Sequence, residues 1–376
     1  MAGARTDTIA GSPAGPPASP DADAVASEHA ALHEGCGLLD RSERGKLALT
    51  GPGAVEFLNG QVTNELLTLR PGEGCYAAFL THKGKMLGDL RILAVGDAAG
   101  TDADGQDAAG GEAAAAGVTE LLLDTERVAL QGLFDMIRRF KVGYELELHK
   151  RTLERGLLSL IGPEAAALAG VDGPGGVLPD VEHAHAAIAI DGIHARAVRT
   201  DVGVDLICDA ADTAALGAAL QARGATPVSE QAAECVRVEH GRPRYGIDLD
   251  DSVIPQEAGL NERAVSFTKG CYVGQETVAR LYYKGKPNRH LRGLRLSQPA
   301  APGEQLVLRE QLLLGEQLLL GERPVGHLAS TAVSPMLGPI ALALVRREAE
   351  PGSVLSVGEH GVSAEVVALP FALQAG

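Results

Sequence analysis

The chain has 376 residues, of which 45% are apolar and 22% charged, and its formal net charge is −16. It is long enough for two or three domains with buried cores, and its acidity argues against general nucleic-acid binding, which usually needs a basic face. The five cysteines are scattered without a CxxC pair, so we predict no disulfide framework, no metal site and a reducing, cytoplasmic location.

Two segments have compositions typical of disorder. Residues 1–27 are rich in Pro and Gly and lack the apolar core of a signal peptide, and residues 96–117 are rich in Gly, Ala and Asp. The second segment separates two apolar runs, so it is predicted to be an insertion between strands. Apolar stretches such as Ile340–Val345 are too short to span a bilayer, and no membrane partner is expected.

Residues 28–285 alternate short apolar runs with helical patterns. Residues 126–141 place apolar side chains at helical spacing, and two apolar runs flank His82–Lys85 as in a hairpin. Helices are expected at 52–60, 126–141, 163–169, 213–223 and 230–240, and strands at 46–50, 75–80, 86–95, 157–161, 187–190, 194–198 and 204–207. This order predicts two α+β domains of ferredoxin-like type.

Residues 286–376 are expected to form a third, C-terminal domain. Short strands separated by Gly and Pro turns, without a convincing long helix, predict a small β-barrel. A six-residue unit beginning Glu-Gln-Leu is repeated three times between Glu304 and Gly321. This period suits no common solenoid, so we interpret it as a local duplication that extends a hairpin or forms a short helix.

The segment Lys269–Glu276 (KGCYVGQE) carries the strongest chemical signal. Two glycines flank Cys271 and permit a tightly shaped loop, and Lys269 lies two residues before the thiol, where a cation favours the reactive thiolate. The alternative is a buried structural cysteine, which is the commoner case for a free thiol. From Lys269 to Arg295 there are seven Lys or Arg against one acid, Glu276, which suggests an anionic partner.

Four further acidic or histidine positions are candidates for a site. Glu239 ends a predicted helix, where the macrodipole disfavours a carboxylate, so it is either a surface residue or a carboxylate held for a ligand. Asp89 lies in an apolar strand and is expected to face solvent. His183 and His185 have no third metal ligand nearby in sequence and are expected in a solvated loop.

Several segments together resemble a known family. KGCYVGQE resembles the KGCYxGQE signature of the YgfZ family of folate-binding proteins, and residues 284–289 resemble its basic continuation. Residues 236–260, 57–64 and 81–90 are similar to the glycine-cleavage T-protein aminomethyltransferases, which share the fold. The resemblance extends from about residue 28 to the end of the chain.

The resemblance implies a three-domain ring with tetrahydrofolate, or a one-carbon or polyglutamyl derivative of it, bound near the centre. It implies that Glu239 binds the pterin and that Cys271 is the functional thiol, in a protein that supports assembly or repair of iron–sulfur clusters with assembly proteins or client enzymes as partners. Clustered cations suit a polyglutamate tail. The candidate folate-binding residues are Glu239, Tyr245, Lys269, Gly270, Tyr272, Gly274, Gln275, Glu276 and Arg280, and the aromatic candidates for stacking on the pterin are Tyr76, Phe79, Tyr245 and Tyr272.

One departure bears on catalysis. The transferases carry an acidic pair in the second hairpin strand, where this chain has Gly88 and Asp89. Only one acid of that pair is present, so the candidate catalytic residues are Asp89 and Cys271. Two alternatives stay open, a folate-dependent aminomethyltransferase or demethylase and a folate sensor or scaffold without chemistry.

Overall fold

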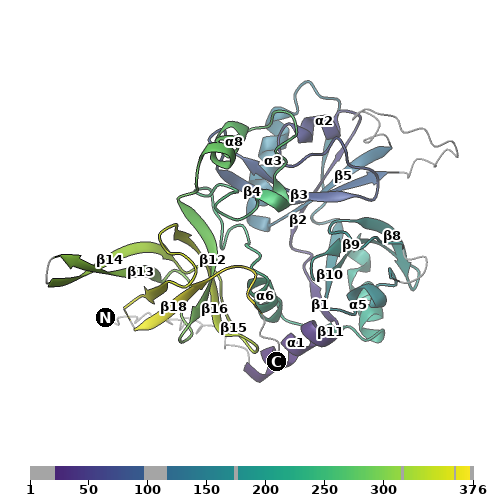
Figure 1. Cartoon of the computed structure of the whole chain (residues 1–376). Coiled ribbons are helices and arrows are strands. Elements are labelled where there is room, and N and C mark those ends of the chain that lie inside the picture. Colours follow the sequence, from purple (N-terminus) through teal and green to yellow (C-terminus); the bar gives the residue numbers. More distant parts are fainter. Residues whose placement is uncertain (1–21, 97–116, 173–176, 315–316, 360, 373–376) are drawn as a thin grey trace, which may run out of the picture.

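The computed structural model of the protein describes residues 22–96, 117–172, 177–314, 317–359 and 361–372. Within these ranges three β-sheets lie around the helix α6 (Glu230–Glu239), which is near the centre of the molecule (Figure 1). Sheets and helices occur together throughout, which confirms the predicted α+β class. None of the helices described is both long and apolar enough to cross a membrane.

The first sheet has the strand order β3-β4-β5-β2-β6 and is entirely antiparallel. The expected hairpin around residues 82–85 is confirmed as β3 and β4, and the expected helix at 126–141 buries Leu133 and Ile137 against this sheet. The middle of the predicted insertion, residues 97–116, lies outside the described residues. The elements are β2 (Gly45–Thr50), α2 (Ala54–Asn59), β3 (Gly74–Leu80), β4 (Met86–Gly96), β5 (Val118–Thr125), α3 (Arg127–Phe140) and β6 (Glu147–Lys150).

The second sheet has the order β11-β1-β7-β10-β9-β8. Its strand β1 precedes the whole first sheet in sequence and pairs with β7 in antiparallel fashion, so the chain leaves this sheet, builds the first one and returns. The elements are β1 (Gly37–Asp40), β7 (Arg155–Ile161), α4 (Ala165–Leu168), β8 (His185–Ile190), β9 (Ile193–Thr200), β10 (Gly203–Asp209), a 3-10 turn (Ala210–Asp212), α5 (Thr213–Ala222) and β11 (Thr226–Pro227).

The helix α1 (Ala22–Glu34) corrects the predicted extent of the N-terminal tail. Residues 22–27 were expected to be disordered, but they form its first turns. The segment is rich in alanine, a strong helix former, and Val25, His29 and Leu32 recur at helical spacing on its buried side. This side packs against α6, and the tertiary contact stabilises a helix whose composition alone suggested disorder.

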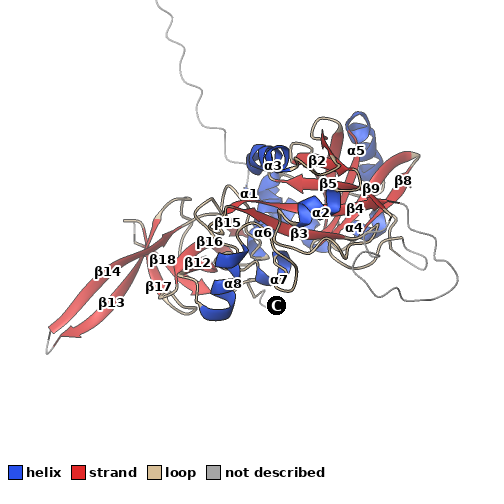
Figure 2. Ribbon diagram, turned by 90° about the horizontal axis from the view of Figure 1, so that it is seen from above, coloured by secondary structure: helices blue, strands red, loops and turns tan. Residues whose placement is uncertain are grey.

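The third sheet is antiparallel, with the order β14-β13-β17-β18-β12-β16-β15. The duplicated segment lies in the hairpin of β13 and β14, which confirms the predicted hairpin and not the alternative of a short helix. These two strands extend away from the rest of the molecule (Figure 2). The elements are β12 (Arg289–Leu296), β13 (Gln305–Leu314), β14 (Gln317–His327), β15 (Thr331–Ser334), β16 (Gly338–Arg346), β17 (Val354–Val357) and β18 (Val362–Val367). Two helices that were not predicted, α7 (Asn261–Ala264) and α8 (Gln275–Lys284), connect α6 to this sheet.

Candidate functional site

Two cavities of about 170 and 160 Å³ adjoin near the centre of the molecule. Residues from four separate parts of the chain line both of them. The turn before β2 supplies two arginines, β3 and β4 supply one side chain each, and α7 supplies a third arginine. The shared lining residues are Arg41, Arg44, Tyr76, Asp89 and Arg263.

Asp89 is the acid of this site, and its predicted exposure to solvent is wrong. Its side chain is buried because β4 is covered on both faces, by α3 and its core on one side and by the groups of the central cavities on the other. The Tyr76 hydroxyl donates a hydrogen bond of 2.6 Å to Oδ2 of Asp89. Burial raises the pKa of Asp89 to about 6, although the bond from Tyr76 lowers it. A carboxyl with this pKa exchanges its proton near neutral pH.

Asp89→Asn is expected to be more stabilising at pH 7.5 than at pH 4. The pKa of Asp89 in the folded chain, about 6, lies above that of an unfolded chain, about 3.9. The stability contributed by the protonated carboxyl is therefore present below the lower value and is lost as the pH rises through the higher one. Relative to wild type, the free energy of unfolding of the variant should gain up to about 3 kcal/mol between the two pH values.

Urea unfolding at pH 4 and pH 7.5 measures this difference. Leu153→Ala, at an exposed side chain that does not titrate, is the control, and its effect should be the same at both pH values. An Asp89→Asn effect that does not change with pH would show that the carboxyl is not perturbed by its surroundings.

Guanidinium groups form much of the remaining wall. The Arg263 guanidinium lies over the ring of Tyr76, with Cζ 4.6 Å from the ring centroid, and pairs with Glu182. Arg44 and Arg91 both pair with the buried Asp124, with nitrogen–oxygen distances of 2.9 and 3.0 Å. The site therefore places guanidinium groups, each paired with an acid, and an aromatic ring beside the buried Asp89, which suits a flat, polar ligand.

His183 is a site residue that the sequence did not indicate, and its predicted place in a solvated loop is wrong. Its side chain is buried, lines the first cavity and stacks on Tyr76 with the ring centroids 6.4 Å apart. Neither ring nitrogen has a hydrogen-bond partner in the described structure, and burial lowers the pKa of the imidazole to about 4. Its φ of 71° is also unusual for a residue other than glycine. Such strain and unmet hydrogen-bonding capacity are typical of functional positions.

His185 and the other aromatic candidates take different places. His185 is buried at the start of β8, where its ring contacts the Glu73 carbonyl and the Arg196 guanidinium, so its prediction as solvated is also wrong. Of the four aromatic candidates, Tyr76 and Tyr245 line the central cavities, whereas Phe79 and Tyr272 are buried in hydrophobic cores.

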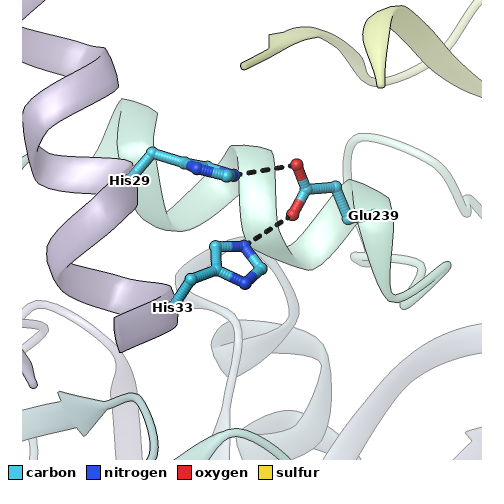
Figure 3. A group of neighbouring side chains, drawn as sticks. All are labelled: His29, His33 and Glu239. Carbon is cyan, nitrogen blue, oxygen red and sulfur yellow. Dashed lines mark hydrogen bonds and ion pairs between the residues drawn. The ribbon is translucent and has the colours of Figure 1, made fainter. Parts of the chain in front are cut away.

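Glu239 lies at the interface of α1 and α6, and it is almost fully buried. His29 donates to Oε1 at 2.8 Å and His33 donates to Oε2 at 3.0 Å, so both imidazoles point at one carboxylate (Figure 3). Ser334 also donates to Oε1. Burial raises the pKa of Glu239, but these three hydrogen bonds outweigh it and hold the pKa well below its usual range. Glu239 is not among the described residues that line the two central cavities. Its role as a pterin ligand stays a prediction.

Lys269 anchors the loop that carries Cys271 to the segment 59–64. The Lys269 ammonium donates to the carbonyls of Asn59, Val62 and Asn64 at 2.7, 3.0 and 2.5 Å, which occupies all three of its hydrogens. Lys269 is thus a structural anchor for the loop, while the Cys271 side chain is exposed. The Asn64 amide in turn donates to the Tyr76 carbonyl, so this anchor also borders the central site.

A glycine of the same motif has a packing role. Gly274 has a φ of +87°, and a Cβ placed on it would lie 2.7 Å from the Thr81 carbonyl oxygen in the β3–β4 turn. Only glycine allows this close approach. Gln275, Glu276 and Arg280 belong to α8, and Gly270 is exposed with open space around it. The described lining residues of the two central cavities include none from Lys269 to Arg280.

The cations between Lys269 and Arg295 do not form one exposed cluster. Lys269 is buried, Arg289 pairs with Glu257 at 2.9 Å, and the exposed cations are Arg280, Lys284 and Lys286 on and after α8. The structure therefore separates the acid of the central cavities from the thiol of the loop, although the residues 59–64 contact both.

Comparison with known proteins gives consistent matches over most of the chain. Residues 13–101 match the GCVT N-terminal domain, and residues 289–372 match the glycine cleavage T-protein C-terminal barrel domain. The aminomethyltransferase of Saccharopolyspora erythraea is 30% identical over 364 residues, covering 92% of this chain and 89% of the relative. The aminomethyltransferase of Geobacillus kaustophilus is 28% identical over 367 residues, covering 92% and 90%.

A solved structure confirms the predicted type of fold. The glycine cleavage system aminomethyltransferase T from Bartonella henselae superposes with a TM-score of 0.75, over 93% of this chain and 90% of that chain, at 24% identity. Together with the barrel-domain match, this likeness establishes the multi-domain T-protein architecture.

Proposed function

Because the chain belongs to the aminomethyltransferase family of glycine cleavage T-proteins, we propose that it binds a reduced folate in the two central cavities. Members of this family use tetrahydrofolate. The chain also keeps the KGCYVGQE loop that resembles the YgfZ branch, so the proposal has two parts, a folate site and a surface thiol.

The observation that carries the folate site is His183. The imidazole is buried and its nearest carboxylate oxygen, on Glu182, lies 3.7 Å from Nε2, so it lacks the hydrogen bonds that it makes with water in the unfolded chain, and a ligand that supplies them is favoured. The pterin ring carries both donors and acceptors on its edge. Its flat face suits the Tyr76 ring and the Arg263 guanidinium. The carboxylates of the glutamate tail suit Arg41, which lines both cavities and pairs with the half-exposed Glu230 at 3.4 Å.

Asp89 gives the same site a proton-transfer group. When bound, tetrahydrofolate supplies the nitrogen that accepts a one-carbon unit. Asp89 holds its proton at pH values below about 6 and releases it above, with Tyr76 fixing the carboxyl through Oδ2. This arrangement supports folate-dependent one-carbon transfer with one acid in place of the acidic pair.

Calorimetric titration with tetrahydrofolate tests the folate site. Wild type should bind one equivalent, and Arg263→Ala should bind at least about tenfold more weakly, because a charge-assisted contact of about 1.5–3 kcal/mol is lost. His183→Ala should also weaken binding. Arg138→Ala, an exposed position on α3, is the control and should bind as wild type. Equal affinity in all four proteins would place the folate elsewhere.

Cys271 supports a second role in iron–sulfur cluster assembly or repair. Of the five cysteines it is the exposed one, and the other four are buried or half-buried. Arg280, Lys284 and Lys286 are exposed on and after the helix that follows it. An exposed thiol is accessible to a partner protein or to a cluster intermediate, and the exposed cations of the following segment favour an acidic partner. This role places the thiol on the outer surface and the folate in the centre, with the residues 59–64 between them.

Cys271→Ser is expected to abolish this support while leaving the fold intact. In cells that lack the wild-type gene, the activity of iron–sulfur enzymes should fall to the level of the deletion, and tetrahydrofolate affinity should be unchanged. Thr268→Ala, an exposed neighbour in the same loop, is the control. Full complementation by Cys271→Ser would contradict the thiol role and would favour a folate sensor or scaffold.

A further inference from the structure

The group formed by His29, His33 and Glu239 has the composition and geometry of a metal-ligand set. His29 and His33 lie four residues apart on α1 and therefore project from the same side of that helix, with ring centroids 4.3 Å apart. Glu239 ends the neighbouring helix α6. The two Nε2 atoms and a carboxylate oxygen lie within 4.8 Å of one another, and both imidazoles are directed at the carboxylate (Figure 3).

We propose that His29, His33 and Glu239 bind a divalent transition-metal ion, for which zinc fits the donor set best. Two imidazole nitrogens and one carboxylate suit zinc and its first-row neighbours, whereas calcium and magnesium require mostly oxygen ligands. The site is separate from the central cavities, so it goes beyond the proposed folate and thiol functions.

Movements of up to about 1.5 Å separate the present geometry from a coordinated one, because the three donor atoms lie within 4.8 Å of one another. Zinc bonds to nitrogen and oxygen are about 2.0–2.2 Å long, so tetrahedral donors are about 3.3 Å apart. The His29 nitrogen is 2.8 Å and the His33 nitrogen 3.0 Å from their carboxylate oxygens. A metal takes the place of the Nε2 hydrogens that now bridge these atoms, each neutral imidazole carries its proton on Nδ1 instead, and each pair opens by a few tenths of an ångström.

The structure also provides access and an open coordination position. The His33 side chain is 22% exposed and lines a cavity of about 280 Å³ together with Asp201 and His240. On another side, the Cys235 thiol donates to Glu239 at 3.6 Å and lines a larger cavity of about 540 Å³. Three protein ligands with an adjacent cavity are typical of zinc sites that keep a position for water or a ligand.

Zinc titration of the metal-free full-length protein tests the proposal. The parent is Cys271→Ser, so that the exposed thiol does not contribute. Against a chromophoric chelator it should bind one zinc ion, and it should unfold at a higher temperature when loaded. His33→Gln keeps a donor for the carboxylate but removes the imidazole, and it should weaken zinc binding by about 100-fold or more.

His240→Ala is the matched control, because His240 lines the same cavity as His33 and follows Glu239 in sequence. It should bind zinc as the parent does. Absence of one-to-one binding by the parent, or equal affinity in His33→Gln, would overturn the proposal and leave the group as a hydrogen-bonded anchor between α1 and α6. The titration contains no folate, so its failure leaves the folate proposal unaffected.

Discussion

Replacing Gly88 by aspartate, which recreates the acidic pair of the transferases, is expected to prevent this chain from folding. A Cβ at position 88 would lie 2.6 Å from the Phe79 ring and 2.7 Å from the Ala129 Cβ, inside the core between β3, β4 and α3. No atom can occupy that space without displacing both neighbours. The carboxylate would also be buried there without a partner.

The expected loss exceeds about 5 kcal/mol, since overpacking and an unpaired buried charge each cost several kcal/mol. That loss is comparable to the total stability of a typical domain, so the variant should be insoluble or lack a cooperative transition in urea. Gly270→Asp is the control, because open space surrounds Gly270, and its midpoint should stay close to that of wild type. A soluble Gly88→Asp protein with a wild-type midpoint would contradict the packing of this core.

Asp89→Asn is expected to lower the rate of one-carbon transfer by about 10²–10⁴, the usual contribution of a positioned acid or base. Asparagine keeps the size of the side chain and can still accept from Tyr76, but it cannot exchange a proton. Affinity for tetrahydrofolate should therefore change much less than turnover. The measurement is single-turnover transfer from an aminomethyl donor to tetrahydrofolate across pH 5 to 8.

Tyr76→Phe serves as the comparison for this experiment. It preserves the ring and removes the hydrogen bond that lowers the pKa of Asp89, so the acid limb of the pH profile should move to higher pH while activity is retained. An Asp89→Asn enzyme that transfers at the wild-type rate would remove Asp89 from the chemistry and leave the site a binding site alone.

Local patterns predicted the regular elements well. The hairpin of β3 and β4 and the amphipathic helix α3 follow directly from spacing, and the structure has both within a residue or two. The helix α1 was missed because its composition resembles that of the preceding tail, and its stability comes from packing on α6, which lies about 200 residues later in the chain. A local stretch of sequence does not reveal a contact between residues so far apart in the chain.

The candidate site residues were also predicted only as far as local sequence patterns allow. The unusual motif around Cys271 identified an exposed thiol, but the structural reasons for Lys269 and Gly274 depend on Asn59 and Thr81, which are distant in sequence. The prediction that Asp89 faces solvent is wrong because a strand pattern does not show what covers the second face of the sheet. The four-residue spacing of His29 and His33 is a signal that the sequence carries, whereas nothing in the sequence marks His183 as a buried residue whose ring nitrogens lack hydrogen-bond partners.

The structure of the complex with tetrahydrofolate tests the central claim most directly. The account predicts the pterin within hydrogen-bonding distance of His183 and Asp89, its ring against Tyr76, and its tail directed toward the arginines of the two central cavities. A pterin found instead in the larger cavity between α1, α6 and the third sheet, or beside the Cys271 loop, would contradict it.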